Sequence, residues 1–263
     1  MKDKILSHLP PAHPWGQSLY WYETIPSTNT QAKVMALAGA PQGTVLLADS
    51  QSAGRGRLGR SFCSHSGAGI YMSVVLRPEC SAAELMHLTC AIGVAACDAI
   101  EEVTGFRPGI KWINDLVGNG KKLGGILTEL VMDGTVIRSA IVGIGINCSQ
   151  EDGDFPPELQ SIACSLSTVT GKNIDRAKLA AALICHLETI SRRLHDRQVI
   201  MDRYRTDCVT LGKQITVIQG DLCRPGLALA VQDDGSLLVR FDDGTVSPVS
   251  AGEVSVRGLW GYT

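Results

Sequence analysis

The segment from Gly54 to Arg60 constrains this chain most, because it reads Gly-Arg-Gly-Arg-Leu-Gly-Arg. Glycine has no Cβ atom, so the backbone there can adopt positive φ angles and approach a ligand closely. The arginine guanidinium is a planar fork of donors that matches carboxylate and phosphate oxygens in pairs. A core helix or strand would leave these charges unpaired. The segment therefore predicts a flexible loop that closes over an anion, with a solvated basic turn as the alternative.

The composition excludes several other classes of protein. The chain has 263 residues, of which 44% are hydrophobic and 19% charged, and its formal net charge is -2. Such a charge gives no bulk attraction to nucleic acid or to an anionic membrane. The nine cysteines form no C-x-x-C pair and no zinc-type spacing, which is typical of free thiols in a reducing cytoplasm. There is no signal-peptide pattern and no apolar run long enough to span a bilayer. We therefore expect a soluble, cytoplasmic, globular protein.

Hydrophobic patterning divides the chain at about residue 208. Before that point the pattern alternates between strand-like and helix-like segments. Strands are expected at 19–22, 44–48, 70–76, 110–115, 121–129 and 136–147, and helices at 30–38, 82–104 and 176–194. After that point, short strands separated by Gly/Asp turns are expected at 213–218, 227–231, 237–241, 246–249 and 254–256, which is typical of a small SH3-like β-barrel. The pattern predicts an α+β fold, with a mixed β-sheet and flanking helices over residues 1–208 and the barrel over residues 209–263.

Four segments carry small polar residues, glycines and cations at the ends of predicted elements. They are 27–29, 51–60, 111–125 and 143–147. The Ser-Thr-Asn sequence at 27–29 also suits a plain helix cap. Glycines inside a strand, as at Gly124 and Gly125, indicate that another group approaches the backbone closely. Taken together, the four segments predict one pocket lined by backbone and a few charges.

The predicted hairpin around Gly118-Asn119-Gly120 brings two charged residues together. It pairs the segment 111–115 with 122–126, so Asp115 and Lys122 are expected to lie close to each other. Lys122 could neutralise an attacking carboxylate and an α-phosphate, and Asp115 could organise a metal ion or a lysine. The alternative is a surface salt bridge, which is worth at most ~1 kcal/mol.

Common catalytic motifs are absent from the sequence. There is no P-loop spacing, no G-x-G-x-x-G turn, no G-x-S-x-G elbow and no H-E-x-x-H pair, and the histidines do not cluster. A covalent serine or cysteine mechanism and a protein-bound metal site are therefore disfavoured. Electrostatic catalysis on a phosphoanhydride fits better, because it depends on positioned charges.

In their order and spacing these motifs resemble those of the biotin–[acetyl-CoA-carboxylase] ligases, the biotin protein ligase family. The matching segments are Ser27-Thr28-Asn29, Gln51, Gly54 to Arg60, Lys111 to Asp115, Lys122 to Ile126, Gly143 to Asn147 and, for the C-terminal barrel, Gly252 to Arg257. The resemblance implies a catalytic domain similar to that of class II aminoacyl-tRNA synthetases. Two positions depart from the family pattern: Ile113 stands where proline is common, and Phe62 where tryptophan is common.

The resemblance implies a two-step reaction. The carboxylate of biotin attacks the α-phosphate of ATP, with Mg²⁺ present, and gives biotinyl-5′-AMP and pyrophosphate. A lysine of a biotin carboxyl carrier protein then attacks this mixed anhydride. The catalytic residues implied are Arg55, Arg57, Asp115 and Lys122. The residues implied to bind biotin or ATP are Ser27, Thr28, Asn29, Gln51, Gly54, Arg55, Gly56, Arg57, Lys111, Asn114, Lys122, Gly124, Gly125 and Asn147.

Within that set the resemblance implies separate roles. Ser27, Thr28, Asn29 and Gln51 would hold the ureido end of biotin, helped by the backbone near Gly124 and Gly125. Arg55, Gly56 and Arg57 would belong to the loop that covers the adenylate, Lys122 would bridge the biotin carboxylate and the α-phosphate, and Asn147 would lie near the nucleotide.

The N-terminus separates two kinds of family member. Regulatory members carry a winged helix-turn-helix module before the Ser-Thr-Asn segment, and only 26 residues precede Ser27 here. We therefore expect the ligase-only type, which does not bind DNA. An exposed sheet edge could form a homodimer. Three alternatives are a lipoate or octanoyl ligase or transferase of similar fold, a nucleic-acid-binding regulator and a non-catalytic biotin-binding protein.

Overall fold

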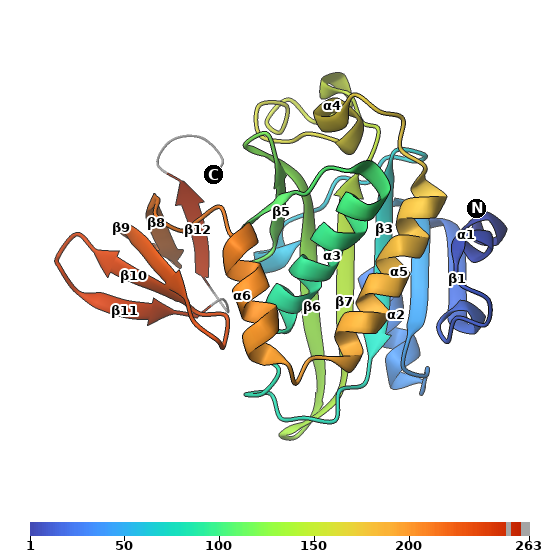
Figure 1. The fold of residues 1–263 in the computed structure, drawn as a ribbon, viewed down its shortest axis with the longest axis horizontal. Coiled ribbons are helices and arrows are strands. Elements are labelled where there is room, and N and C mark those ends of the chain that lie inside the picture. Colours follow the sequence, from blue (N-terminus) through green and yellow to red (C-terminus); the bar gives the residue numbers. More distant parts are fainter. Residues whose placement is uncertain (251–253, 259–263) are drawn as a thin grey trace.

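The computed structural model describes residues 1–250 and 254–258 (Figure 1). Within these residues, seven strands form one sheet in the order β1-β2-β3-β7-β6-β5-β4, and five form a second in the order β11-β10-β9-β8-β12. The pair β1 and β2 is parallel and β2 and β3 are antiparallel, so the large sheet is mixed. The predicted α+β architecture is therefore confirmed, with a small barrel-like sheet after the larger one. Gly252 and Glu253 of the predicted barrel motif lie outside the described residues.

The elements follow one another in this order. The large sheet contains β1 (Leu19–Ile25), β2 (Thr44–Gln51), β3 (Gly69–Leu76), β4 (Gly109–Lys111), β5 (Asp115–Gly118), β6 (Lys121–Asp133) and β7 (Val136–Asn147). The helices are α1 (Lys2–His8), α2 (Thr28–Leu37), α3 (Leu88–Thr104), α4 (Leu166–Thr170), α5 (Arg176–Arg192) and α6 (Arg197–Asp207). The small sheet contains β8 (Gln214–Gln219), β9 (Leu222–Val231), β10 (Leu237–Phe241), β11 (Val246–Val249) and β12 (Val254–Gly258). No helix of the described residues is long and apolar enough to cross a membrane.

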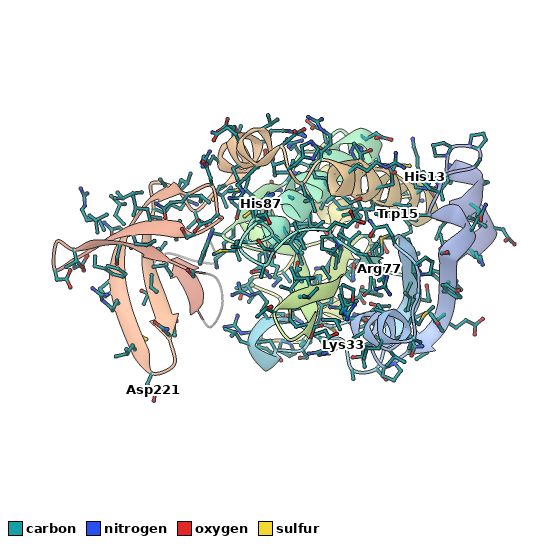
Figure 2. All side chains as sticks on the ribbon, turned by 90° about the horizontal axis from the view of Figure 1, so that it is seen from below. His13, Trp15, Lys33, Arg77, His87 and Asp221 are labelled. Atoms are coloured by element: carbon teal, nitrogen blue, oxygen red, sulfur yellow. The ribbon has the colours of Figure 1, made fainter. Side chains whose placement is uncertain are left out.

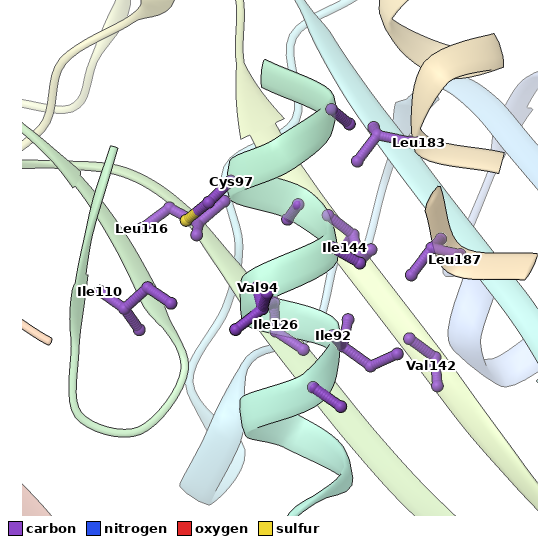
Figure 3. Packing of buried hydrophobic residues seen from close by; sticks show 14 of the residues in the cluster. Ile92, Val94, Cys97, Ile110, Leu116, Ile126, Val142, Ile144, Leu183 and Leu187 are labelled. Atoms are coloured by element: carbon purple, nitrogen blue, oxygen red, sulfur yellow. The ribbon is translucent and has the colours of Figure 1, made fainter. Parts of the chain in front are cut away.

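The main core lies between one face of the large sheet and the helices α3, α5 and α6 (Figure 1). Figure 3 shows Ile92 of α3 and Leu187 of α5 directed towards β7, where alternate residues such as Val142 and Ile144 are buried. Successive side chains of a strand point to opposite faces, so these residues present one apolar row to the helices. Each such side chain contributes about 1.5–3 kcal/mol on full burial.

The opposite face of the sheet is covered by α2 at one end only. Ala32 and Ala36 of α2 pack there against a small apolar cluster that includes Ile141 of β7. Further along β7, the residues on the same face are Gly143 and Gly145. Because glycine has no side chain, other groups can approach the sheet closely here, and both glycines line a cavity.

The structure corrects several predicted boundaries. The strand expected at 110–115 is interrupted, because β4 ends at Lys111 and β5 begins at Asp115, with a turn at 112–114 between them. The helix expected from residue 82 begins at Leu88. The helices α1, α4 and α6 were not predicted. In α6 only a few side chains, among them Tyr204, are buried, so tertiary packing rather than a strong apolar pattern accounts for this helix.

The turn that interrupts the predicted strand contacts helix α6, the segment between α6 and β8, and the β9–β10 turn of the small sheet. The backbone N–H of Trp112 donates to Thr210 Oγ1 at 2.9 Å, and its indole Nε1–H donates to the carbonyl of Gly235 at 2.9 Å. The hydroxyl of Tyr204 donates to the carbonyl of Ile113 at 3.2 Å. Figure 2 shows the rest of the small sheet projecting away from the body of the molecule, with Asp221 at the lower edge of the sheet in this view.

Candidate active site

A cavity of about 560 Å³ lies over the glycine-lined end of the sheet. It brings together the four segments singled out by sequence, although they are far apart in the chain. The predicted residues that line it are Ser27, Thr28, Asn29, Gln51, Arg55, Gly56, Arg57, Lys111, Asn114, Asp115, Lys122, Gly125 and Asn147.

Gly54 and Gly124 do not line the cavity but allow its walls to pack closely. A Cβ atom on Gly124 would lie 2.4 Å from the carbonyl oxygen of Gly145 on the neighbouring strand. A Cβ atom on Gly54 would lie 2.4 Å from the carbonyl oxygen of Phe62. Real Cβ atoms do not approach so closely, so both glycines permit close backbone contact.

One end of the cavity is a polar network at the start of α2. The Ser27 hydroxyl accepts from Thr30 N at 3.4 Å and caps the helix. The backbone N–H of Thr28 donates to Gln51 Oε1 at 2.9 Å, and Gln51 Nε2 donates to Ser64 Oγ at 3.0 Å. The helix cap and the cavity wall are therefore built from the same residues.

Asn29 is a buried member of this network. Its Oδ1 is 2.6 Å from Ser73 Oγ, and its Nδ2 donates to the carbonyl of Leu127 at 3.3 Å and to Glu129 Oε2 at 2.9 Å. A Cβ atom on Gly143 would lie 2.2 Å from Asn29 Oδ1, so the side chain occupies the space that this glycine leaves. Sequence reasoning missed Ser73 and Glu129. Both residues lie on the same face of the sheet as the glycines that line the cavity, and the alternation of side chains along the strands could have indicated this.

The loop from Gly54 to Phe62 folds back on itself as a small hairpin. Gly56 N donates to the Arg60 carbonyl at 2.7 Å, and Phe62 N donates to the Gly54 carbonyl at 2.9 Å. The Phe62 ring covers Gly145, because a Cβ atom on that glycine would lie 2.5 Å from Phe62 Cζ. This aromatic contact holds the loop against the sheet, and it requires a glycine beneath the ring.

The two central arginines of the loop reach different partners. Arg55 pairs with Glu129 through two contacts, Nη1 to Oε2 at 3.1 Å and Nη2 to Oε1 at 3.1 Å. Arg57 donates from Nη1 to Asn114 Oδ1 at 3.2 Å. Burial lowers the pKa of Arg57, although nearby Asp115 opposes this shift.

The Lys122–Asp115 pair is where the hairpin predicted it. Lys122 Nζ donates to Asp115 Oδ1 at 2.6 Å, and the two side chains are 33% and 19% exposed. Both approach Gly125, since a Cβ atom there would be 3.4 Å from Asp115 Oδ1 and 3.5 Å from Lys122 Nζ. The Lys122 ammonium group therefore lies above a glycine and faces the cavity.

Comparison with known proteins identifies the family. The model described as "Biotin/lipoate A/B protein ligase family" matches residues 21–147, and the one described as "Biotin protein ligase C terminal domain" matches residues 210–257. The bifunctional ligase/repressor BirA of Bacillus subtilis is 37% identical over 238 residues, which cover 90% of this chain and 73% of that protein. The chain belongs to the biotin protein ligase family.

Further members of the family agree. The biotin--[acetyl-CoA-carboxylase] ligase of Mycobacterium tuberculosis is 34% identical over 236 residues, covering 87% of this chain and 85% of that protein. The solved structure of the Aquifex aeolicus biotin protein ligase in complex with biotin and ATP superposes with a TM-score of 0.78 at 29% identity. That match covers 92% of this chain and 99% of the Aquifex chain. The resemblance read from the motifs is therefore confirmed.

The other end of this ligase cavity is apolar. Phe155, Leu159 and Ile162, from the segment that follows β7, line it, and the Ile162 carbonyl accepts from Lys122 N at 2.7 Å. Asn147 stands at the same end and donates from Nδ2 to the carbonyl of Cys164 at 3.0 Å. Lys111 is 8% exposed and also lines the cavity. Residues 1–250 and 254–258 contain no cluster of three or more His, Cys, Asp or Glu side chains that could hold a metal ion.

Proposed function

We propose that this protein is an ATP-dependent biotin ligase, which activates biotin as biotinyl-5′-AMP and transfers biotin to a lysine of a biotin carboxyl carrier protein. The observation that carries the proposal is a single cavity with a hydrogen-bonding end at Asn29 and a cationic centre at Lys122. The names of the relatives above support the same activity.

The polar end suits the ureido group of biotin. A ureido group has two N–H donors and a carbonyl acceptor, and a buried polar atom without a partner costs ~1–3 kcal/mol. Ser27, Thr28, Asn29 and Gln51 supply donors and acceptors in that part of the cavity. We propose that these side chains exchange some of their mutual hydrogen bonds for bonds to biotin.

The first step takes place at Lys122. A carboxylate oxygen of biotin forms a bond to the α-phosphorus of ATP, and the bond to the β-phosphate oxygen breaks to release pyrophosphate. The Lys122 ammonium reduces the repulsion between the two anions that meet in this step. Arg57, at the same part of the cavity, offers further donors to the phosphate oxygens.

The apolar end suits the adenine base of ATP. Phe155, Leu159 and Ile162 offer an apolar surface to the ring, while Lys111 and Asn147 offer polar contacts beside it. Mg²⁺ arrives as the counter-ion of ATP. Magnesium ions in such sites bind one or two carboxylates together with substrate phosphates, and Asp115 is the lining carboxylate among the described residues that fits this use.

The second step transfers the acyl group. The ε-amine of the carrier lysine attacks the carbonyl carbon of biotinyl-5′-AMP, the carbon–oxygen bond to AMP breaks, and the amine loses a proton. Water would hydrolyse the same anhydride, so the cavity must stay covered until the carrier arrives. The loop 54–62 lies where such a cover is needed.

Several expectations extend the proposal to the whole molecule. We propose a catalytic domain at residues 1–208 and a barrel domain at 209–263, and a cytoplasmic location. A net charge of -2 predicts no tight binding to DNA. A homodimer through an open sheet edge is a further prediction, which sedimentation would test.

Pyrophosphate release tests the function directly. We expect release from ATP that depends on biotin and is much weaker with lipoate. A preference for lipoate would support the lipoate-type alternative, and biotin binding without pyrophosphate release would support a non-catalytic binding protein. Tight, salt-sensitive binding in a gel-shift assay would instead favour a nucleic-acid-binding regulator.

A further inference from the structure

The Arg55–Glu129 pair joins a side chain of the loop to strand β6. Both guanidinium nitrogens Nη1 and Nη2 meet the two carboxylate oxygens at 3.1 Å. A two-point contact of this kind fixes the orientation of both partners as well as their distance. The Arg55 side chain lines the cavity and is 47% exposed, and that of Glu129, behind the lining, is 21% exposed.

The position of the pair separates Arg55 from the phosphate chemistry. Glu129 follows Gly125 by four residues on β6, which is about 13 Å along a strand. The Lys122–Asp115 pair lies at Gly125, whereas Arg55 reaches the sheet at Glu129. Arg55 therefore stands at the end of the cavity formed by Asn29, away from the cationic centre.

Glu129 also contacts that end of the cavity directly. Its Oε2 accepts from Asn29 Nδ2 at 2.9 Å and from Arg55 Nη1 at 3.1 Å. Asn29 is 4% exposed, and its Oδ1 is held by Ser73 at 2.6 Å. One carboxylate thus joins the loop to a side chain that faces the polar end of the cavity.

We propose that Glu129 is a positioning residue for biotin, which latches the loop through Arg55 over the polar end of the cavity and orients Asn29. This inference rests on the proposed function. Arg55 then acts through Glu129 and retains biotin, whereas the charge that the α-phosphate meets comes from Lys122 and Arg57. The role differs from the one that the family resemblance gives Arg55, which is to cover the adenylate.

A double-mutant cycle with Arg55→Gln and Glu129→Gln tests the latch. The glutamine at 129 keeps an oxygen that can accept from Asn29 but loses the charge that holds Arg55. We expect each single substitution to raise the biotin KM and the biotin dissociation rate about fivefold. The KM for ATP and the kcat at saturating biotin should stay near the wild-type values, and the double variant should resemble each single one.

The controls separate failure of the latch from failure of the function. Arg138→Gln removes an ion pair with Asp133 on the same hairpin, whose side chains are both 63% exposed, and should leave the biotin KM unchanged. If wild-type protein releases pyrophosphate but the two substitutions act additively, or change the KM for ATP instead, the latch is wrong. If wild-type protein is itself inactive with biotin, the proposed function fails. If Glu129→Gln unfolds, as judged by its Tm, Arg55→Gln alone tests the latch. A raised KM for biotin then supports the latch, and a raised KM for ATP contradicts it.

Discussion

At the scale of single residues, the charged pair at the centre of the cavity contributes little to the stability of the fold. Lys122 and Asp115 are part-exposed, so their ion pair contributes little to stability after solvent screening. The same charge also lowers the repulsion between two approaching anions. Substitutions here should therefore separate activity from stability.

Replacing Lys122 by alanine should impair adenylate formation far more than folding. A preorganised charge at a reacting phosphate is typically worth about 10²–10³ in rate, whereas loss of the part-exposed pair costs at most about 1 kcal/mol. Single-turnover pyrophosphate release measures the first effect, and thermal unfolding measures the second. Normal pyrophosphate release by the variant would remove Lys122 from the mechanism.

Replacing Arg57 by glycine should let biotinyl-5′-AMP leave the enzyme early. The change removes charged donors and a bulky side chain that reaches Asn114. A hydrogen bond to a charged group is worth about 1.5–3 kcal/mol, so we expect the intermediate to dissociate roughly 10–100-fold faster. Stopped-flow release of purified biotinyl-5′-AMP gives the rate. An unchanged rate would mean that Arg57 does not hold the intermediate.

At the scale of elements, β7 determines where the cavity can exist. Its alternate residues bury an apolar row on one face and leave Gly143 and Gly145 on the other. The side chain of Asn29 and the ring of Phe62 occupy the space above these glycines. A strand with larger residues at both positions would have the same core and no cavity.

Replacing Gly143 by alanine should weaken biotin binding. The new Cβ atom would lie 2.2 Å from Asn29 Oδ1, so Asn29 must move from its partners. Overpacking of this kind costs about 1–3 kcal/mol, and we expect the Kd for biotin to rise by about tenfold or more with a lower Tm. Gly153, with no atom within 4 Å of its added Cβ, provides the matched control. Equal effects of the two alanine substitutions on calorimetric Kd would refute the packing argument.

The segment that follows the loop is connected to helix α5 through Asp49, which lies near the end of β2. Asp49 accepts hydrogen bonds from Ser66 and from Gly67 N at 3.0 Å, and from Arg176 Nη2 at 2.8 Å. Partial burial alone would raise the pKa of Asp49, but these hydrogen bonds and the Arg176 charge lower it overall. The ionised carboxylate is therefore the form that stabilises the fold.

This shift predicts how stability depends on pH. Because the pKa of Asp49 is lower in the folded than in the unfolded state, its contribution is complete above the unfolded value of about 3.9 and is lost as the pH falls through the folded value. The Tm of wild-type protein should exceed that of Asp49→Asn at neutral pH, and the gap should close in strong acid. Asp221→Asn, in the exposed β8–β9 turn, should show no gap. A gap for Asp49→Asn that is constant with pH would contradict this assignment.

The sequence predicted most of the residues that line the cavity, but not the residues that hold them in place. Lys122 and Asp115 are seven positions apart across a recognisable turn, so local pattern was enough to bring them together. Arg55 and Glu129 are 74 positions apart, so the folded sheet, and no local pattern, brings them together. The helix α6 was missed for a similar reason, because its buried side chains pack on distant elements instead of forming a strong apolar stripe.

At the scale of the whole molecule, the two sheets meet at the site. Trp112 lines the cavity, while its indole N–H is bonded to Gly235 in a turn of the small sheet. The small sheet thus supports the segment between β4 and β5 that carries Asn114. Sequence predicted both the large sheet and the small one, but the contact between them depends on tertiary packing that neither pattern contains.

Biotin transfer to a carrier tests the central claim most directly. The protein is incubated with biotin, Mg-ATP and a biotin carboxyl carrier domain, and the intact mass of the carrier is then measured. We predict that the carrier gains the mass of one biotinyl group on a single lysine, and gains nothing when biotin or ATP is left out. A carrier that keeps its original mass beside folded, biotin-binding protein would contradict the account.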